Sequence, residues 1–415
     1  MNLLFSNRSY RSLFFATGIS NLGDGVAALA FPWLASLITR DPLLIAAVAF
    51  ANRLPWLLLT IPIGALTDRK SRKELMVYAD IFRFLLTICV IGLVIFMPSA
   101  SHGTHEVFLI TILSCLAFLL GSAEVVRDNS AQTVLPSIVS PKDLETANGQ
   151  MWSIEQIMGA FIGPPLAGVL IAIALPAPFA LDAVTFGWAA YLVWHTSIAP
   201  TAPASRQSLA QSTAEAWGWM RAHGAILRLA LMLGFMNLQA TIIVTLLVLF
   251  AQDILILSAI GYGILLTAGA AGGVAAGLAG PKIVTRIGSQ KSALLALGLF
   301  PLQCLLIATA SSPFTVGFAL FIGMFGALLW NVTTVSYRQR LIPNRLLGRV
   351  NSLYRFFGWG FMPVGALLGG WMVSLAEPQL GRQAALRLPF YICFGTGTLM
   401  MIYGILRCRL TKDGK

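Results

Sequence analysis

The chain has 415 residues, of which 57% are hydrophobic and only 11% are charged, and its mean hydropathy is +0.80. This composition excludes a soluble protein of two or three domains, because too little polar surface remains to face water. The net charge of +12 is spread over short clusters rather than one basic face. It therefore argues against nucleic acid as a partner and favours membrane lipids with anionic headgroups.

Apolar runs of about twenty residues recur along the chain, and each can cross about 30 Å of hydrocarbon as a helix. The runs lack the alternation of barrel strands, so we expect an all-α polytopic membrane protein with about 12 transmembrane helices. The predicted spans cover residues 12–37, 43–67, 74–97, 107–135, 147–174, 178–198, 225–251, 258–281, 291–310, 313–340, 349–375 and 388–407.

Basic residues indicate the orientation of these spans. About 21 of the 28 Lys and Arg residues lie in the termini and in loops on the same side, whereas Arg40, Arg382 and Arg387 lie on the other. Because loops rich in Lys and Arg remain in the cytoplasm, we expect both termini to be cytoplasmic.

Ionisable residues inside the first five spans are candidate functional residues, since each is costly in lipid. Asp24 lies near the middle of the first span, and Arg53 reaches a similar depth in the second, so the two can pair. Glu124 and Arg127 share one face of the fourth span, and Glu155 lies in the middle of the fifth.

A carboxylate that faces a cavity can load and release a proton when its exposure and its arginine neighbours change. We interpret Asp24, Glu124 and Glu155 as proton-coupling candidates, and Arg53 and Arg127 as residues that tune their charge. Fixed structural ion pairs are the alternative for each carboxylate.

Two further acidic residues lie nearer the ends of their spans, Asp80 towards the cytoplasm and Asp182 towards the outer surface. We expect both to be structural.

The segment "IPIGALTDRKSRKEL", residues 61–75, concentrates six charged side chains in seven positions, 68–74. Ser71 and Glu74 match a capping box at the start of the third span. The cluster is either a capped basic turn that orients the protein or a latch. In the latch, Asp68 pairs with a basic residue or a helix N-terminus of the other bundle and closes the cytoplasmic side.

The fifth span contains "GAFIGPPLAG", in which Gly159 and Gly163 are four residues apart, followed by Pro164 and Gly168. Such glycines let helices approach closely, and proline bends the helix. The expected partner is "GAAGGVAAGLAG" in the eighth span, where Gly269, Gly273 and Gly277 repeat at the same interval. Ordinary small-residue packing is the alternative.

The one long polar segment, residues 199–224, begins with the Ala, Pro and Ser residues of a linker. We therefore expect two six-helix bundles, residues 1–198 and 225–415. A shift of 202 residues supports pseudo-symmetry between them, because it aligns identical residues at helix starts and packing positions. The aligned pairs are Pro141 and Pro343, Leu144 and Leu346, Gly163 and Gly365, Leu166 and Leu368, and Gly168 and Gly370.

The second half offers polar and aromatic side chains that can line a substrate cavity. These candidates are Phe235, Asn237, Gln239, Trp330, Asn331, Tyr354, Arg355 and Trp359. The sequence contains no metal-binding cluster, nucleophile and base pair or phosphate loop, so we expect neither an enzyme nor a cofactor. His102 and His105 have a spacing that can hold a metal, but a solvated loop is the favoured interpretation.

The segment "GALTDRKSRK" resembles the loop signature of the major facilitator superfamily. Gly64, Asp68, Arg69, Arg72 and Lys73 match it position by position, with Ser71 where the family usually has glycine. The related segment "GPKIVTRIGSQK" of the second half has Thr285 in place of the acid. The resemblance implies a cytoplasmic gate latch with a single complete copy in the first half.

"GAFIGPPLAG" resembles the antiporter motif of that superfamily. The segments "RLPWLLLTIPIGALTDR", "QTVLPSIVSPKDLETANGQ" and "AWGWMRAHGAILRLALMLGFMN" resemble the enterobactin-exporter-like and macrolide-efflux-like permeases. This resemblance implies a monomer in the bacterial cytoplasmic membrane. It also implies proton-coupled export, by alternating access, of a small amphipathic compound such as a drug or siderophore.

Other functions remain open at this stage. They are a proton-coupled importer or symporter of a small nutrient, a lysophospholipid transporter, and a sensor or scaffold that transports nothing. The antiporter motif argues against the importer.

The latch hypothesis makes a prediction about Asp68. Replacing Asp68 with Asn should slow turnover far more than it weakens substrate binding, because a latch changes the rate of gating without contacting substrate. Transport rate and binding affinity measured on the same purified variant check this. An equal loss of both would contradict the latch.

Overall fold

The computed structural model describes residues 3–67, 70–96, 104–140, 143–197 and 209–407. Within these ranges every regular element is a helix. The chain divides into two compact units. Unit 1 comprises Met1–Arg40, Ala47–Ser205 and Leu257–Thr267, and unit 2 comprises Asp41–Ala46, Arg206–Ile256 and Ala268–Lys415.

Every predicted span has a corresponding helix in the described part of the chain, where nine helices are long and apolar enough to cross a membrane. One of these, α12 (Ala259–Thr309), consists of two helices joined at Gly288. The consecutive helices α3 (Pro42–Leu58) and α4 (Thr60–Thr67) form another span, and α9 (Ala177–Trp194) forms a further one. The prediction of an all-α polytopic membrane protein is confirmed.

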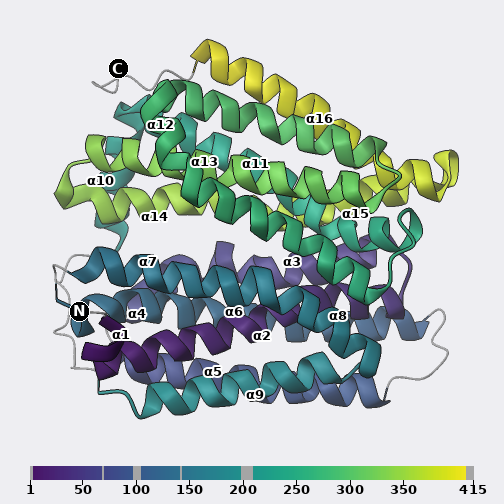
Figure 1. The fold of residues 1–415 in the computed structure, drawn as a ribbon, viewed down its shortest axis with the longest axis horizontal. Helices are drawn as coiled ribbons and strands as arrows, with labels where there is room; N and C mark the ends of the chain where they lie inside the picture. Colours follow the sequence, from purple (N-terminus) through teal and green to yellow (C-terminus); the bar gives the residue numbers. More distant parts are fainter. Residues whose placement is uncertain (1–2, 68–69, 97–103, 141–142, 198–208, 408–415) are drawn as a thin grey trace. The chain divides into compact units, whose positions relative to one another are not determined.

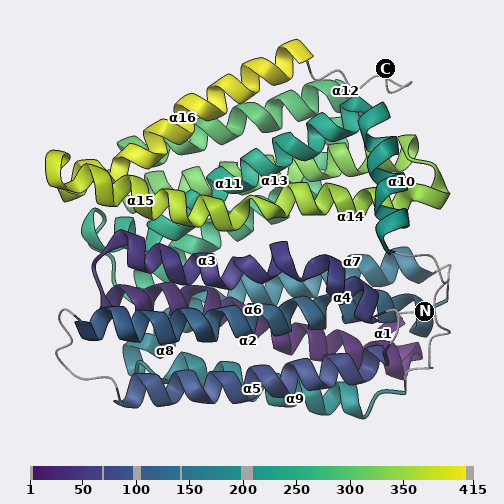
Figure 2. The same ribbon diagram turned by 180° about the vertical axis from the view of Figure 1, so that it is seen from behind.

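The remaining helices of unit 1 are α1 (Leu3–Ser6), α2 (Arg8–Ile38), α5 (Arg72–Phe96), α6 (Thr104–Ile138), α7 (Leu144–Glu155), η2 (Gln156–Ile162) and α8 (Gly163–Ile173). Helix α9 packs against both α2 and α5, and α5 packs against α6, so these four helices lie side by side in Figures 1 and 2. They carry most of the charged residues discussed below.

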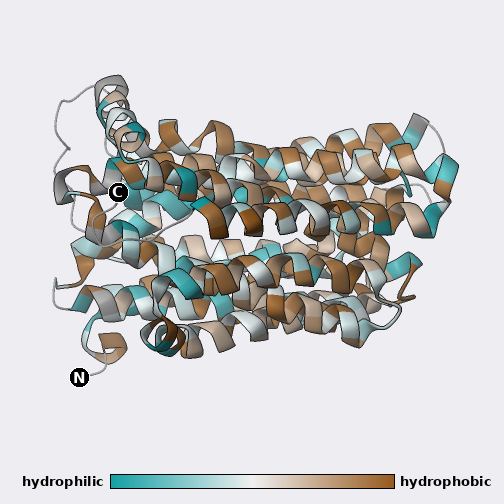
Figure 3. Cartoon of the chain, turned by 90° about the horizontal axis from the view of Figure 1, so that it is seen from above, coloured by the Kyte–Doolittle hydropathy of each residue, from teal (hydrophilic) through white to brown (hydrophobic). Residues whose placement is uncertain are grey.

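The remaining helices of unit 2 are α10 (Leu209–Ala222), α11 (Gly224–Asp253), α13 (Pro313–Leu341), α14 (Asn344–Gly360), α15 (Met362–Leu380) and α16 (Arg382–Arg407). Helix α11 packs against α14, α15 and α16. Hydrophobic residues run along the helices of each unit, as the hydropathy colouring in Figure 3 shows. On α5, for example, Ile81, Leu85 and Ile88 are exposed, which is the surface expected of a helix that faces lipid.

The glycine motif of the fifth span lies where α7 passes into α8 through a π-helical turn, η2. Pro164 and Pro165 follow this turn directly, and their missing N–H donors disturb the regular hydrogen bonding of the preceding residues. A Cβ atom at Gly163 would lie 2.6 Å from the Cα of Gly25 in α2, and one at Gly25 would lie 2.7 Å from the carbonyl carbon of Gly159. The backbones of the two spans are therefore in direct contact.

The corresponding glycines of unit 2 make equivalent contacts. A Cβ atom at Gly365 would collide with the carbonyl of Leu238 in α11, as one at Gly163 would with α2. Gly168 lies against the first residues of α12, where a Cβ would be 2.9 Å from the Cα of Ile260, and Gly370 lies equally close to Pro42 at the start of α3. Residues 202 apart thus perform the same packing role, which supports the predicted repeat.

The antiporter motif meets the predicted eighth span, in α12, but through other residues than the predicted glycines. Gly269 and Gly273 lie against Met324 of α13, and the neighbouring Gly272 lies against the backbone of Phe321. The residue that meets the fifth span is Gly263, where a Cβ would be 2.5 Å from the carbonyl oxygen of Pro164. The repeat of small residues continues beyond the actual contact, so spacing indicates the partner helix but not which of its residues meet the fifth span.

Two predicted loops contain helix instead. The segment between the spans 258–281 and 291–310 is helical except at Gly288, whose φ of 81° and ψ of 161° suit only glycine. One residue therefore makes the connection for which the sequence predicts a loop. Within the polar segment 199–224, α10 is a helix, and its Ala216 and Met220 are buried in the core of unit 2.

The contact between α2 and α8 predicts that Gly163→Ala destabilises the protein. The new methyl group needs a backbone shift, and such overpacking costs about 1–3 kcal/mol. Gly149→Ala in α7 is the matched control, since nothing lies within 4 Å of a Cβ there. Thermal unfolding of the purified proteins measures the difference, and equal melting temperatures for both variants would contradict the close contact.

Candidate functional site

Charged side chains from six spans gather in unit 1 and are here called the charge cluster. Its members are Asp24 of α2, Arg53 of α3, Asp80 and Arg83 of α5, Glu124, Arg127 and Asp128 of α6, Glu155 of α7 and Asp182 of α9. Charges inside a membrane protein are costly unless they pair or face water, so such a gathering is a candidate functional site.

Arg83 is the best connected member of the charge cluster. Its guanidinium forms an ion pair with Asp24, and its Nη1 donates to Ser20 Oγ at 3.2 Å. The same Nη1 lies 3.6 Å from Asp80 Oδ1 on its own helix, and the guanidinium lies over the ring of Phe186 in α9, 3.8 Å from its centroid. Arg83 thereby joins α2, α5 and α9, although only 3% of its side chain is exposed.

Arg127 performs a similar role from α6. Its Nε lies 3.7 Å from Asp80 Oδ1, its Nη1 lies 3.9 Å from Asp128 Oδ1, and its Nη2 donates to Thr17 Oγ1 of α2 at 3.4 Å. Asp80 is completely buried between the two arginines. This arrangement compensates the buried carboxylate from two helices.

Four of the other carboxylates, Asp24, Asp128, Glu124 and Glu155, are partly exposed, whereas Asp182 is buried. The side chain of Asp24 is 31% exposed and that of Asp128 is 36% exposed, while Glu124 and Glu155 are half-buried. Glu124 lies within electrostatic range of Asp24 and Arg53. The charge cluster therefore combines a buried ionic core with carboxylates that a proton can reach.

The structure brings together the five predicted residues of the proton-coupling hypothesis but pairs them differently. Among the described ion pairs, Asp24 binds Arg83 rather than Arg53, because α2 and α5 both pack on α9 and present these side chains to each other. Glu155 lies within electrostatic range of Arg127 and Asp128, which connects α7 to the cluster.

Sequence reasoning missed Arg83 as a central residue, and it expected Asp80 and Asp182 to be structural without connecting them to the other charges. A signal was available, since Asp80 and Arg83 are three residues apart in an apolar helix and so share one face. Asp182 is buried on α9, where it leaves no room for a side chain at Gly23 of α2. Its proximity to the cluster depends on helix packing and is not visible in the sequence.

The predicted gate latch is described in part. Asp68 and Arg69 lie outside the described residues, and Gly64 lies in α4. Arg72 donates from Nη1 to the carbonyl of Thr133 in α6 at 2.7 Å, and Lys73 lies 5.9 Å from the ring centroid of Trp194. Both basic residues thus make contacts within unit 1.

One of the two hydrogen bonds of the predicted capping box is present. The backbone N–H of Glu74 donates to Ser71 Oγ at 3.4 Å, at the start of α5. The serine therefore contributes to helix capping in the charged turn.

Several predicted cavity residues of unit 2 are engaged in helix packing. Trp330 and Tyr354 are buried in its hydrophobic core, and the Tyr354 hydroxyl donates to the carbonyl of Leu229 at 3.3 Å. Gln239 is also buried, and its Nε2 donates to Thr396 Oγ1 at 2.6 Å. Asn237 donates from Nδ2 to the carbonyl of Gly358 at 2.8 Å.

The other predicted cavity residues are more accessible. Asn331 and Arg355 are exposed, and Phe235 and Trp359 are half-buried. The guanidinium of Arg355 lies 5.8 Å from the ring centroid of Trp359. These four side chains retain surface that a ligand can contact.

The described residues hold no group of three or more His, Cys, Asp or Glu side chains arranged to bind a metal ion. Of the two histidines noted in the sequence, His102 lies outside the described residues and His105 is exposed on α6.

Comparison with known proteins gives a match over nearly the whole chain. The sequence profile of the transmembrane secretion effector family, a branch of the major facilitator superfamily, matches residues 4–397. The multidrug efflux pump Tap of Mycobacterium tuberculosis is 28% identical over 169 residues, which are 39% of this chain and 37% of that protein. Tap of Mycolicibacterium fortuitum is 27% identical over 163 residues, 39% and 38% of the respective chains. The similarity thus spans little more than a third of these relatives.

Solved structures show the same fold over almost the full length. A mutant of the nucleoside transporter NupG has a TM-score of 0.77 at 13% identity, covering 96% of this chain and 99% of that one. A bacterial homologue of the iron transporter ferroportin, in an inward-facing state, has a TM-score of 0.76 at 18% identity, covering 96% and 98%. At such low identity the likeness establishes the fold alone.

The buried ionic core makes a prediction about stability. Arg83→Met should destabilise the protein by roughly 3 kcal/mol or more, because buried carboxylates lose a compensating charge. A second change, Asp24→Asn, should recover part of this loss, since the two residues are directly paired. Melting temperatures of the purified variants measure both effects.

Arg286→Met is the control, because Arg286 is exposed on α12 and surface changes stay within about 0.5 kcal/mol. If Arg83→Met melts at the same temperature as this control, the assigned role of Arg83 is wrong.

Proposed function

Because the chain belongs to the transmembrane secretion effector family of the major facilitator superfamily, we propose that this transporter exports a small amphipathic compound in exchange for protons. The compound is of the class to which drugs and siderophores belong, and export proceeds by alternating access. The observation that carries the proposal is the charge cluster of unit 1.

The balance of charges in the cluster supports proton binding. Among its described members, six carboxylates face three arginines. Uncompensated negative charge is unfavourable inside a membrane protein, so binding of protons by some of these carboxylates stabilises the cluster. Four carboxylates, Asp24, Glu124, Asp128 and Glu155, retain partial exposure and so are the ones that protons reach.

Asp24 is the best placed to couple a proton to a movement of helices. It binds Arg83 directly and is partly exposed, whereas Arg83 is buried. Protonation of Asp24 removes the charge that holds the guanidinium, which still has Asp80 within 3.6 Å. A switch of Arg83 between these two carboxylates would loosen α2 from α5, so proton binding changes helix packing.

Glu124 and Glu155 are proposed to pass protons to and from this pair. Glu124 interacts electrostatically with Asp24 and Arg83. Glu155 interacts electrostatically with Arg127 and Asp128. Arg53 and Arg127 then tune the charge of these acids, as the sequence predicts. Coupled carboxylates of this kind titrate as a group rather than one by one.

Substrate is proposed to contact the accessible side chains of unit 2. Asn331 and Arg355 are exposed, and Phe235 and Trp359 present aromatic surface. This combination suits an amphipathic molecule, because aromatic rings bury its apolar part while amide and guanidinium groups bind its polar part. Trp330 and Tyr354 belong to the buried core against which Phe235 packs.

The export direction is supported by the segment shared with the multidrug efflux pump Tap and by the glycine and proline motif of the fifth span. We place the protein in the bacterial cytoplasmic membrane as a monomer with both termini in the cytoplasm. The distribution of Lys and Arg supports this orientation.

Efflux assays test the proposal. Cells that express the protein are loaded with a fluorescent dye, an antibiotic or an iron siderophore complex, and efflux is followed with and without a protonophore. We expect the protonophore to abolish efflux. Asp24→Asn and Glu124→Gln should each slow proton-driven efflux on the order of tenfold or more, since they remove the coupling between proton and substrate.

Glu74→Gln is the control, because Glu74 is exposed at the start of α5 and glutamine also suits its capping position. All rates are divided by the amount of protein in the membrane. Efflux that persists with the protonophore, or full activity of both cluster variants, would refute proton coupling.

A further inference from the structure

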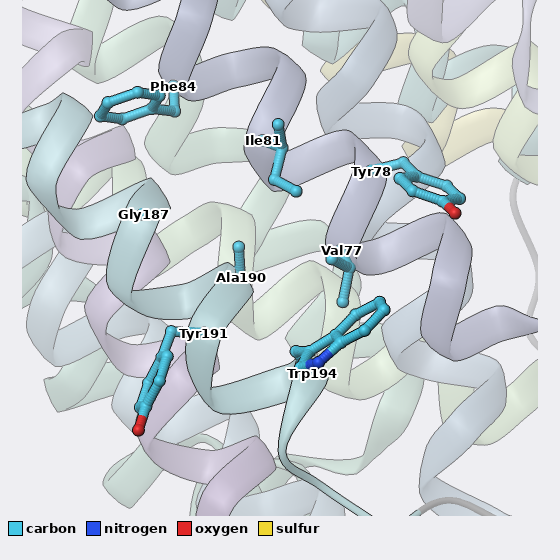
Figure 4. Close-up of a pocket in the computed structure, with 8 residues that line it drawn as sticks. All are labelled: Val77, Tyr78, Ile81, Phe84, Gly187, Ala190, Tyr191 and Trp194. Carbon is cyan, nitrogen blue, oxygen red and sulfur yellow. The ribbon is translucent and has the colours of Figure 1, made fainter.

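An apolar groove runs along the outer side of unit 1 between α5 and α9. It has a volume of about 510 Å³ and is lined by Val77, Tyr78, Ile81, Phe84, Gly187, Ala190, Tyr191 and Trp194. Figure 4 shows Phe84 and Tyr78 towards opposite ends, with Ile81 and Ala190 between them. The volume falls within the range of about 300–1,000 Å³ that is typical of small-molecule sites.

Large aromatic side chains form the sides of the groove, and small residues form its floor. Tyr78, Tyr191 and Trp194 are 61%, 54% and 55% exposed, so these large rings stand away from the core. Between them the floor is formed by Gly187 and Ala190. A Cβ atom at Gly187 would lie 3.8 Å from Phe84, so the small residue leaves open a space that a larger side chain would fill.

The position of the groove along the helices determines what surrounds it. Tyr78 is six residues and Phe84 twelve residues from the start of α5 at Arg72, which corresponds to about 9 Å and about 18 Å along the axis. The groove therefore extends from near the membrane surface towards the middle of the hydrocarbon. At this depth its natural occupant is an acyl chain, because water is excluded from the hydrocarbon.

The shallow end of the groove carries positive charge. Lys73 lies 5.9 Å from the ring centroid of Trp194, so a cation–π contact keeps its ammonium group at the mouth of the groove. Lys70 is exposed and precedes it by less than one turn. Among the described residues, an acidic side chain is also near, since Glu74 is exposed one position further along α5.

Aromatic rings with polar edges, an apolar groove and a lysine at its mouth together match the parts of one phospholipid molecule. Tyr and Trp side chains prefer the level of the headgroups, and a lysine near the surface attracts anionic lipid. The two helices that form the groove pack closely against each other within unit 1, so the groove belongs to this unit alone.

We propose that the groove between α5 and α9 binds one anionic phospholipid, with an acyl chain along Ile81 and Gly187 and its phosphate group beside Lys73. The site depends only on the surface of unit 1, and it is independent of which compound is transported and of proton coupling. Bound lipid fills the space between the two helices and so stabilises their packing.

Lipid binding to the purified full chain tests this proposal. The protein in detergent is titrated with phosphatidylglycerol or with phosphatidylcholine of the same acyl chains, and bound lipid is counted by native mass spectrometry. We expect one phosphatidylglycerol to bind in preference to phosphatidylcholine. Lys73→Gln should weaken that binding about fivefold, the change expected for one lysine near an anionic headgroup.

Gly187→Leu should abolish retention of this lipid, because the new side chain occupies the floor of the groove. Gly92→Leu is its matched control on α5, where nothing lies within 4 Å of a Cβ. The control for charge is Lys282→Gln, which removes an exposed lysine of α12. Both controls should change the affinity less than twofold.

Equal binding of the two lipids by the wild type would overturn the choice of an anionic lipid. Unchanged binding in both Lys73→Gln and Gly187→Leu would place the lipid elsewhere and overturn the site. If Gly187→Leu does not fold, the comparison of Lys73→Gln with Lys282→Gln decides alone, and equal losses in the two would overturn the role of Lys73.

Discussion

The ion pair between Arg83 and Asp24 is the interaction on which the organisation of unit 1 depends. A guanidinium has five donors and cannot lose its charge, so its burial requires partners from several directions. Ser20 and Asp24 supply them from α2, Asp80 from α5 and the ring of Phe186 from α9. These helices cannot separate at this level without leaving a charge unpaired in a medium of low dielectric constant.

This constraint also explains how a proton can influence the whole unit. Asp80 is buried between Arg83 and Arg127, whereas Asp24 and Asp128 are partly exposed. In the proposed coupling, a proton from water would reach the partly exposed carboxylates first and alter the partners of the buried arginines. Each change of charge there has a large effect on the electrostatic free energy, because a medium of low dielectric constant screens charges little.

Close backbone contacts at glycines also hold helices together within each unit. Lipid provides no hydrophobic force between helices, so close packing must supply the stability. Gly25 meets Gly163 in unit 1, and Leu238 meets Gly365 in the equivalent place of unit 2. Both units thus use one packing scheme, while the dense ionic network is described in unit 1.

Hydrophobic runs, breaks at glycine and proline, and the shift of 202 residues were sufficient to predict the spans and their repetition, because these features depend on local composition and on the thickness of a bilayer. The sequence also singled out Asp24, Glu124 and Arg127, since charge is costly wherever a span crosses lipid. It could not show that Asp24 pairs with Arg83, that Gly263 rather than Gly269 meets the fifth span, or that Gly187 forms the floor of a groove. Only the tertiary structure decides these contacts, because they depend on the rotation of each helix about its axis and on which residues of another helix lie opposite.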